Sequence, residues 1–145
     1  MQRPTRYDCL METARIWAKR GTCPRAEVGA VIEKNGRIIS IGYVGAPMGS
    51  LHCSDLGCLI YSESEGCVRG IHAEINAIGF AARNGIPTEG STLHVTVSPC
   101  LRCSQAIIAA GIIKVVYDEE YRDLRGIEYL KQNGVYVGQY QIERW

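Results

Sequence analysis

The strongest constraint on the fold of this chain is a pair of motifs that carry metal-ligand residues in two separate stretches. His72 and Glu74 open one apolar, helix-like stretch, and Pro99 with Cys100 and Cys103 opens another. Proline suits the first turn of a helix, and residues three apart share a helix face, so the two cysteines converge on one point. A helix N-terminus also favours the thiolate form that a metal requires. A fold that uses both motifs must bring two helix N-termini to one metal ion.

The residue types of the two motifs predict a catalytic zinc site. His72, Cys100 and Cys103 supply three protein ligands and leave one coordination position open. Zinc held in this way lowers the pKa of a bound water to about 7, which makes hydroxide available at neutral pH. Glu74 is predicted to carry protons from this water to the substrate and to the leaving group. Alone, the two cysteines would equally fit a redox pair or half of a structural zinc site; with the upstream motif they indicate a zinc hydrolase.

Length, charge and cysteine content exclude several other classes of protein. A chain of 145 residues with 46% hydrophobic residues is long enough for a single domain, here residues 1–145, with its own core. A net charge of +1 without a basic cluster argues against nucleic acid and favours a small-molecule substrate. We expect no signal peptide and no membrane span. The seven cysteines therefore predict metal-binding thiols in a reducing cytoplasm, and not a disulfide framework.

Helix and strand patterns alternate along the chain. The first helix is expected over 7–19, and strands over 28–32 and 37–43 form a hairpin around Asn-Gly, a pair that favours a tight turn. Further helices are expected from 72 to about 83 and over 101–110 and 124–133, with strands over 92–97, 114–117 and 135–137. This order predicts an α/β sandwich with parallel strand pairs and a site at the carboxyl end of a strand. Cys9 and His94 are interpreted as packing residues.

A cysteine-rich insertion at about 49–70 shows no helix or strand period, so something other than a core must hold it. Four cysteines could supply thiolates for a second, closed, structural zinc site: Cys23, Cys53, Cys58 and Cys67. His52 is the substitute ligand if one cysteine is not used. Free buried thiols or a disulfide are the alternatives.

Together these motifs resemble the deoxycytidylate deaminase family over about residues 23–137. The shared features are the hairpin, a Gly-Tyr-x-Gly-x-Pro-x-Gly loop, the insertion, His-Ala-Glu-x-Asn-Ala-Ile, Ser-Pro-Cys-x-x-Cys and Val-Tyr-x-x-x-Tyr. The resemblance implies a cytidine deaminase-like fold, which is a three-layer α/β/α sandwich around a mixed five-stranded sheet. It also implies zinc-dependent hydrolysis of dCMP to dUMP and ammonia for dTMP synthesis, in which zinc-bound hydroxide attacks C4 and Glu74 shuttles protons.

The resemblance also implies substrate contacts. The backbone around Ala73 faces the pyrimidine carbonyl, the Ser98 carbonyl accepts from the exocyclic amine, and Tyr121 lies against the nucleotide. Val28 belongs to the family's hairpin pattern and joins this substrate-binding set. Val44 stands where the family usually has an asparagine that hydrogen-bonds the sugar, and valine offers neither donor nor acceptor. This departure puts sugar recognition and the preferred nucleotide in question, but not the deamination chemistry.

Regulation and assembly are implied by the resemblance alone. It implies a homo-oligomer, commonly a hexamer, that is activated by dCTP and inhibited by dTTP, with Mg²⁺ accompanying a nucleotide effector. In some members a second zinc uses cysteines at the positions of Cys23 and Cys53. Arg83 and Asn84 could serve an effector site or a subunit contact, although a helix-capping surface pair is an equal alternative.

The sequence leaves open which residues bind phosphate, and it leaves two other functions as alternatives. Arg25, Arg69 and Arg122 are candidates for a phosphate contact, although a lone arginine is commonly a solvated surface charge. Another superfamily member could act on a free base, a nucleoside or tRNA, but a tRNA enzyme should show a basic face. A non-enzymatic zinc-binding module could use the cysteines of the insertion, and it would leave Glu74 without a role.

Overall fold

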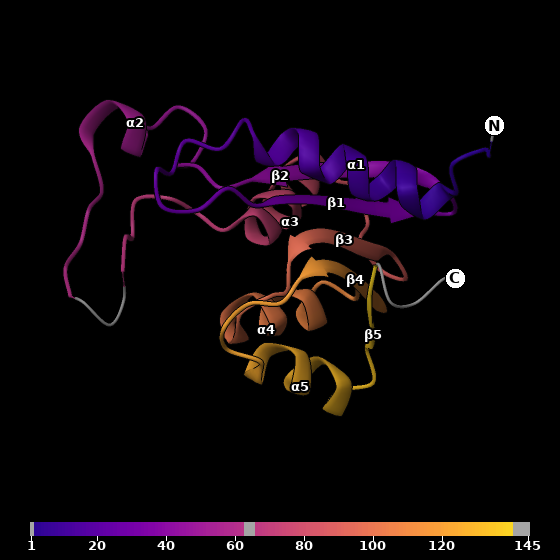
Figure 1. Ribbon diagram of the computed structural model, residues 1–145. Helices are drawn as coiled ribbons and strands as arrows, with labels where there is room; N and C mark the ends of the chain where they lie inside the picture. The colour runs from indigo at the N-terminus through magenta and orange to yellow at the C-terminus, as the bar shows by residue number, and fades with distance from the viewer. Residues whose placement is uncertain (1, 63–65, 141–145) are drawn as a thin grey trace.

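A mixed β-sheet forms the middle layer of the computed structural model, which describes residues 2–62 and 66–140 (Figure 1). The sheet has the order β2-β1-β3-β4-β5. Its strands are β1 (Gly29–Lys34), β2 (Arg37–Tyr43), β3 (Thr92–Val97), β4 (Lys114–Glu119) and β5 (Tyr136–Gln139). The β2–β1 and β1–β3 pairs are antiparallel, and the β3–β4 and β4–β5 pairs are parallel. The predicted mixed five-stranded sheet is therefore confirmed for the described residues.

Helices cover both faces of this sheet. Over the described ranges they are α1 (Arg6–Ala18), α2 (Cys53–Leu56), α3 (Ala73–Arg83), α4 (Leu101–Ala109) and α5 (Arg125–Gln132). On one face, Met11 and Ala14 of α1 pack with Val31 and Val116 of the sheet. The larger core joins the opposite face to α3, α4 and α5, and Figure 1 shows α4 and α5 on the side away from α1. This arrangement confirms the three-layer α/β/α fold.

The tight turn between β1 and β2 follows from its two central residues. Asn35 has φ 53° and Gly36 has φ 79°, the left-handed region that a two-residue hairpin turn of this kind requires at both positions. The hairpin then places β2 directly under α3. A Cβ built on Gly42 would lie 2.1 Å from the carbonyl oxygen of Ala73, so only glycine allows the first turn of α3 to approach so closely. The N-terminus of α3 is thereby fixed against the sheet.

Two details of the helical regions differ from the sequence predictions. Cys9 is exposed, so its interpretation as a packing residue is wrong. The buried stripe of α1 runs instead through Leu10, Met11, Ala14 and Ala18. Helix α2 in the insertion was not predicted because a helix of four residues is too short to show a period. None of the helices in the described part of the chain is long and apolar enough to cross a membrane.

His94 is a fully buried histidine in the middle of β3, with 0% of its surface exposed. Neither ring nitrogen has a hydrogen-bond partner among the described residues. Its ring lies 5.5 Å from that of Tyr7, centroid to centroid. Burial, and then the charge of Lys114, lowers the pKa of His94 to about 4. The folded protein therefore keeps this imidazole neutral across the range in which a free histidine takes up a proton.

We expect this histidine to make the fold sensitive to acid. Its pKa is depressed in the folded state, so the unfolded chain binds the extra proton below about pH 6.5 while the folded chain does not. The free energy of unfolding should fall as the pH drops from about 6.5 towards 4, by up to roughly 3 kcal/mol. Urea unfolding of wild type and His94→Leu at several pH values measures the effect as a difference between the two slopes. Parallel slopes would show that another group is responsible.

Candidate zinc centre and substrate cavity

The structure brings His72, Cys100 and Cys103 together at the carboxyl end of β3. Their ligand atoms all lie within 4.8 Å of one another. The Nδ1 atom of His72 is 3.6 Å from Sγ of Cys100 and 3.3 Å from Sγ of Cys103. His72 is the N-cap of α3, Cys100 is the N-cap of α4, and Cys103 lies in the first turn of α4. The two helix N-termini thus converge on one point, as the spacing predicted.

The packing of α5 fixes the loop that carries the cysteines. A Cβ built on Gly126 would lie 2.1 Å from the carbonyl oxygen of Pro99 and 2.8 Å from the carbonyl carbon of Cys100. Ser98 sits at the end of β3 with 3% of its surface exposed, and its N–H donates to the carbonyl of Glu119 at 2.8 Å. Its Oγ accepts from the N–H of Tyr121 at 2.7 Å. These contacts hold the loop between β3 and α4 from both sides.

The electrostatics of the three ligands fit a divalent cation. A hydrogen bond from Cys103, together with His72, lowers the pKa of the Cys100 thiol to about 4. The same hydrogen bond to the Cys100 thiolate, together with burial and the charge of Glu74, raises the pKa of the Cys103 thiol. One thiolate therefore opposes the formation of the other, and a cation between them removes that opposition. The donor set of one imidazole and two thiolates suits zinc.

Glu74 lies against this centre and is buried, with 4% of its surface exposed. Its Oε2 is 3.6 Å from Sγ of Cys103, and the carboxyl comes from the first turn of α3, two residues after His72. Burial raises the pKa of the Glu74 carboxyl. The upward direction of this shift favours the protonated form that a proton carrier passes through.

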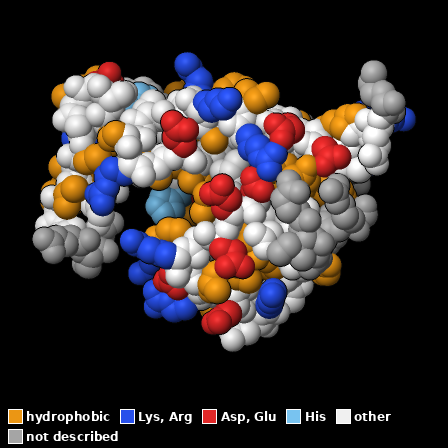
Figure 2. All heavy atoms as spheres, in the orientation of Figure 1, with side chains coloured by type: hydrophobic (Ala, Val, Ile, Leu, Met, Phe, Trp, Pro, Cys, Tyr) orange, Lys and Arg blue, Asp and Glu red, His pale blue; other side chains and the backbone are white. Residues whose placement is uncertain are grey.

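A cavity of about 780 Å³ opens beside the three ligands. Figure 2 shows a hollow with a histidine side chain exposed in it and Lys and Arg side chains near its rim. All of the substrate-contact residues expected from the sequence line the cavity, namely Val28, Val44, Ala73, Ser98 and Tyr121. The glutamate and the ligands His72 and Cys100 also border it. The cavity therefore joins the predicted substrate residues to the candidate zinc centre.

The rim of the cavity is basic. Among the residues that the structure describes, four exposed arginines line it: Arg25, Arg102, Arg122 and Arg125. Arg125 is paired with Asp123, with Nη2 to Oδ2 at 2.7 Å. Arg122 lies over the ring of Tyr121, 5.6 Å from its centroid. Of the arginines proposed from the sequence, Arg69 is not in the lining, and its Nε donates to the carbonyl of Gly57 at 3.0 Å.

Sequence reasoning missed several residues of the site. Arg102 and Gln105 line the cavity from α4, and Asp123 and Arg125 line it from the start of α5. Arg102 could have been found from the sequence, because it lies between the two cysteines in the first turn of the predicted helix. Asn76 acts one turn into α3, where its Nδ2 donates to the carbonyl of Tyr43 at 2.7 Å and so ties the loop containing Val44 to the helix.

Arg83 and Asn84 lie at the opposite end of α3, outside the cavity lining. The Nη1 atom of Arg83 is 3.9 Å from Sδ of Met48. The side-chain amide of Asn84 donates to the carbonyl of Phe80 at 2.9 Å, a local capping contact. Neither residue therefore touches the cavity.

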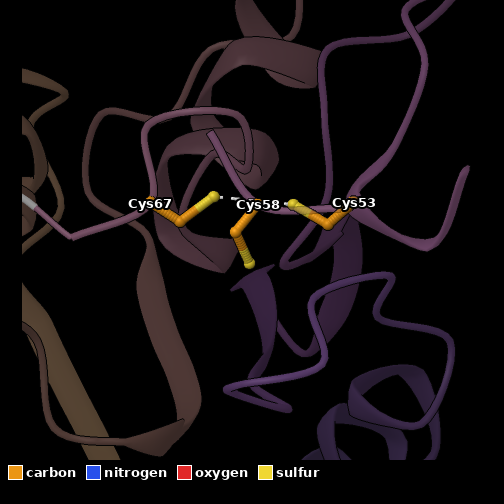
Figure 3. A group of neighbouring side chains, drawn as sticks. All are labelled: Cys53, Cys58 and Cys67. Atoms are coloured by element: carbon orange, nitrogen blue, oxygen red, sulfur yellow. Dashed lines mark hydrogen bonds between the residues drawn. The ribbon is translucent and has the colours of Figure 1, made fainter. Parts of the chain in front are cut away.

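A second group of potential metal ligands lies in the insertion. The sulfur atoms of Cys53, Cys58 and Cys67 all lie within 4.8 Å of one another, and Figure 3 shows Cys53 and Cys67 pointing toward one another. Their Sγ atoms are 3.6 Å apart. Cys23 is not in this group, although it lies close enough to contribute, after burial and Cys67, to a raised pKa of Cys58. We use the term cysteine cluster for Cys53, Cys58 and Cys67.

His52 is also outside the cysteine cluster. Its Nδ1 accepts a hydrogen bond from the N–H of Ala46 at 3.1 Å and lies 3.0 Å from Oγ1 of Thr22. This ring nitrogen therefore holds the loop after β2.

Comparison with known proteins agrees with the class of enzyme that the site suggests. The family model described as the cytidine and deoxycytidylate deaminase zinc-binding region matches residues 4–119. The chain belongs to this family of zinc-binding deaminases, hydrolases that act on cyclic amidines.

Several known proteins are similar to this chain over most of its length. ComE operon protein 2 of Bacillus subtilis is 40% identical over 144 residues, which cover 99% of this chain and 75% of the relative. The deoxycytidylate deaminase of Enterobacteria phage T4 is 38% identical over 148 residues, with 77% of each chain covered. The crystal structure of dCMP deaminase from the cyanophage S-TIM5, in complex with dCMP and dUMP, has a TM-score of 0.83 and 36% identity and covers 96% of this chain and 99% of that one. The cytidine deaminase-like fold is thereby confirmed.

Proposed function

We propose that the protein hydrolyses dCMP to dUMP and ammonia, a step toward dTMP. The observation that carries this proposal is a cavity that combines the histidine–cysteine centre and Glu74 with a rim of arginines. The inner end of the cavity offers the chemistry of deamination, and the rim offers positive charge to a phosphate. A nucleoside or a free base would leave that charge unused. The similarity to deaminases of dCMP supports the same substrate.

In the proposed reaction His72, Cys100 and Cys103 hold one zinc ion. When bound, zinc lowers the pKa of a water to about 7 and so makes hydroxide available for attack at C4. Glu74 would take a proton from the attacking water on its carboxylate and give it to the ring nitrogen beside C4. It would then take the proton of the new C4 hydroxyl and pass it to the departing amine, as C4 becomes the carbonyl of dUMP. The backbone of Ala73 faces the pyrimidine carbonyl, and the carbonyl of Ser98 accepts from the exocyclic amine.

The rim of the cavity is proposed to bind the 5′-phosphate. Arg25 and Arg122 were suggested by the sequence, and the cavity adds Arg102. Arg125 is already paired with Asp123 and is the weaker candidate. Tyr121, which lies beside Arg122, is proposed to pack against the nucleotide.

The test of this function is ammonia release from dCMP, compared with deoxycytidine, cytosine, CMP, dCTP and 5-methyl-dCMP. Zinc per chain is counted on the same sample. We expect dCMP to be the best substrate, and deoxycytidine to be much poorer because it lacks the phosphate. Equal turnover of deoxycytidine and dCMP would contradict the phosphate role of the rim.

Val44 sets a specific expectation for sugar recognition. It lines the cavity with 7% of its surface exposed, and its backbone is fixed by an N–H bond to the carbonyl of Val28 at 3.3 Å. An asparagine here could hydrogen-bond the 3′-hydroxyl of dCMP, and leaving such a hydroxyl unpaired in a buried site costs about 1 to 3 kcal/mol. We therefore expect Val44→Asn to raise kcat/KM for dCMP by roughly 5- to 150-fold.

The matched comparison for Val44→Asn is 2′,3′-dideoxy-CMP, which lacks that hydroxyl. The gain should disappear with this substrate, and Val44→Ala, which changes volume without adding a donor, should show no gain with either. A gain of equal size with both nucleotides would mean that the asparagine acts through packing and not through the sugar.

A second, structural zinc ion is proposed at the cysteine cluster, with Cys23 as the fourth ligand. Burial disfavours the Cys67 thiolate, but backbone N–H groups of Arg69, Leu59 and Gly70 outweigh it and lower the pKa of Cys67 to about 6. Donors of this kind stabilise the thiolate that zinc requires. His52 is the weaker candidate because its Nδ1 is engaged by Ala46.

The remaining features of the proposed function concern regulation and assembly. The protein is proposed to act in the cytoplasm as a homo-oligomer, a hexamer on the family pattern, with dCTP as activator, dTTP as inhibitor and Mg²⁺ bound with the effector. Arg83 and Asn84 are proposed for the effector site or the subunit contact, and their distance from the substrate cavity agrees with such a role.

A further inference from the structure

The insertion that carries the cysteine cluster has little else to hold it in place. Most of its large apolar side chains are exposed: Leu51 by 58%, Leu56 by 57%, Ile60 by 50%, Tyr61 by 76% and Val68 by 43%, while Leu59 is half-buried. Among the described residues of the insertion, Cys53 alone is in the buried hydrophobic set, and it belongs to the cluster itself. Figure 1 shows the described part of the insertion extending away from the sheet. Hydrophobic burial therefore contributes little to its conformation.

This same insertion forms one wall of the substrate cavity. Gly66, Cys67 and Gly70 line the cavity, and so does Cys23. A Cβ built on Gly70 would lie 3.6 Å from Cγ1 of Val44, so the wall packs over the residue expected to face the sugar. One member of the cysteine cluster is thus also a cavity residue.

Backbone contacts connect the cysteine cluster to the candidate zinc centre. Cys67 pairs with Ile60 in an isolated β-bridge, and the N–H of Leu59 points at the Cys67 sulfur at 3.3 Å. Further along, Ile71 pairs with Gly45 through hydrogen bonds of 2.8 and 3.3 Å, immediately before His72. This wall is a short segment, residues 67–71, which we call the strap. Cys67 fixes its first residue, and Ile71, next to His72, fixes its last.

We propose that metal binding at the cysteine cluster holds this wall of the substrate cavity in place, so that occupancy of the second metal site sets nucleotide affinity while the chemical step is unaffected. Three of its proposed ligands, Cys53, Cys58 and Cys67, come from both arms of the insertion, and one cation cross-links these arms. This inference rests on the proposed function for its ligand, dCMP.

The energetic reason is an ordering cost. Without the cross-link, three neighbouring thiols with few apolar contacts leave the strap in a mixture of conformations, and the nucleotide must select the one that completes the cavity. The apparent dissociation constant rises by the inverse of the competent fraction, so a wall formed one tenth of the time weakens binding about 10-fold. Glu74 and the catalytic ligands lie on α3 and α4, which pack on the sheet, so the chemistry of bound substrate is retained.

The decisive variant is Cys58→Ser, because Cys58 belongs to the cysteine cluster but does not line the cavity. Zinc per chain, kcat for dCMP, and the dCMP dissociation constant are measured for it, the last by calorimetry in a Glu74→Gln background in which turnover is expected to be slow. Trypsin cleavage after Arg69 reports the conformation of the strap without any nucleotide. Cys9→Ser is the matched control, since Cys9 is exposed on α1. Cys58→His is the rescue variant, because imidazole is also a zinc ligand.

We expect Cys58→Ser to lose one zinc per chain, keep kcat, weaken dCMP binding about 10-fold or more, and become sensitive to cleavage at Arg69. Cys58→His should restore zinc, affinity and protection, and Cys9→Ser should match wild type. Loss of one zinc with unchanged affinity and unchanged cleavage would overturn the inference. Failure of the proposed function would give a different result, because wild type would then neither hydrolyse nor bind dCMP. The zinc count and the cleavage pattern would still show whether metal at the cysteine cluster holds the strap in place.

Discussion

Replacing Glu74 by glutamine is expected to lower kcat for dCMP by about 10²- to 10⁴-fold, the usual contribution of a positioned proton carrier. Glutamine has the size of glutamate, so it fits a site where only 4% of the side chain is exposed. It cannot take a proton from water or return one to the ring nitrogen. The three metal ligands are untouched, so zinc per chain should stay at the wild-type value. Ammonia release and zinc content on one preparation measure both effects.

Glu128→Gln is the control for this substitution, because Glu128 is exposed on α5 and lies outside the cavity lining. It removes the same charge and should leave kcat unchanged. If Glu74→Gln also kept full turnover, Glu74 would not be the proton carrier. If wild type and variant were both inactive on every cytosine compound while they retained zinc, the hypothesis of a non-enzymatic zinc module would stand in place of the enzyme.

The sequence was sufficient for the fold and the metal centre because both depend on local signals. Asn35 and Gly36 tolerate the positive φ that a two-residue hairpin turn requires, and together with the β-branched runs on either side they placed the first two strands. The spacing of Cys100 and Cys103 brought both to the start of α4 as expected, but Pro99 lies one residue before the N-cap Cys100 and not in the first turn of the helix. His72 and Cys100 are both N-caps in the structure, although neither makes a side-chain capping bond. The expectation of two converging helix ends came instead from the apolar helical run that follows His72 and from Pro99 beside the first cysteine.

The rest of the site depends on packing between distant segments, which spacing does not encode. Arg102 and Arg125 come from different helices and meet at one rim only because Gly126 lets α5 lie against the backbone at Pro99. The sequence pointed to all four cysteines as metal ligands. That three of them form a group and Cys23 lies outside it depends on the tertiary structure. Cys9 was misassigned because the apolar stripe of α1 is shifted by one position, and one position on a helix turns a residue by about 100°.

Replacing Cys103 by serine is expected to remove the catalytic zinc and to abolish turnover. Cys103 is buried, with 1% of its surface exposed, and its sulfur lies 3.3 Å from Nδ1 of His72. Among the described residues, Cys100 and Cys103 are the two cysteines grouped with His72, so no third sulfur is in place to substitute. A serine hydroxyl stays protonated and is a poor zinc ligand. Without the metal, hydroxide must come from water of pKa about 15.7 instead of about 7, so we expect kcat to fall by roughly 10⁴-fold or more.

Zinc content and turnover, measured together, distinguish this substitution from Cys58→Ser and from Glu74→Gln. Cys103→Ser and Cys58→Ser should each lose one zinc per chain, but only the first should lose kcat, because the two ions are proposed to do different work. Glu74→Gln should lose kcat and keep both ions. Cys103→Ser with full zinc and full turnover would contradict the assignment of the catalytic ligands. Equal loss of kcat in both cysteine variants would instead mean that the two metal sites fold as one unit, since Cys67 and His72 are joined by so short a strap.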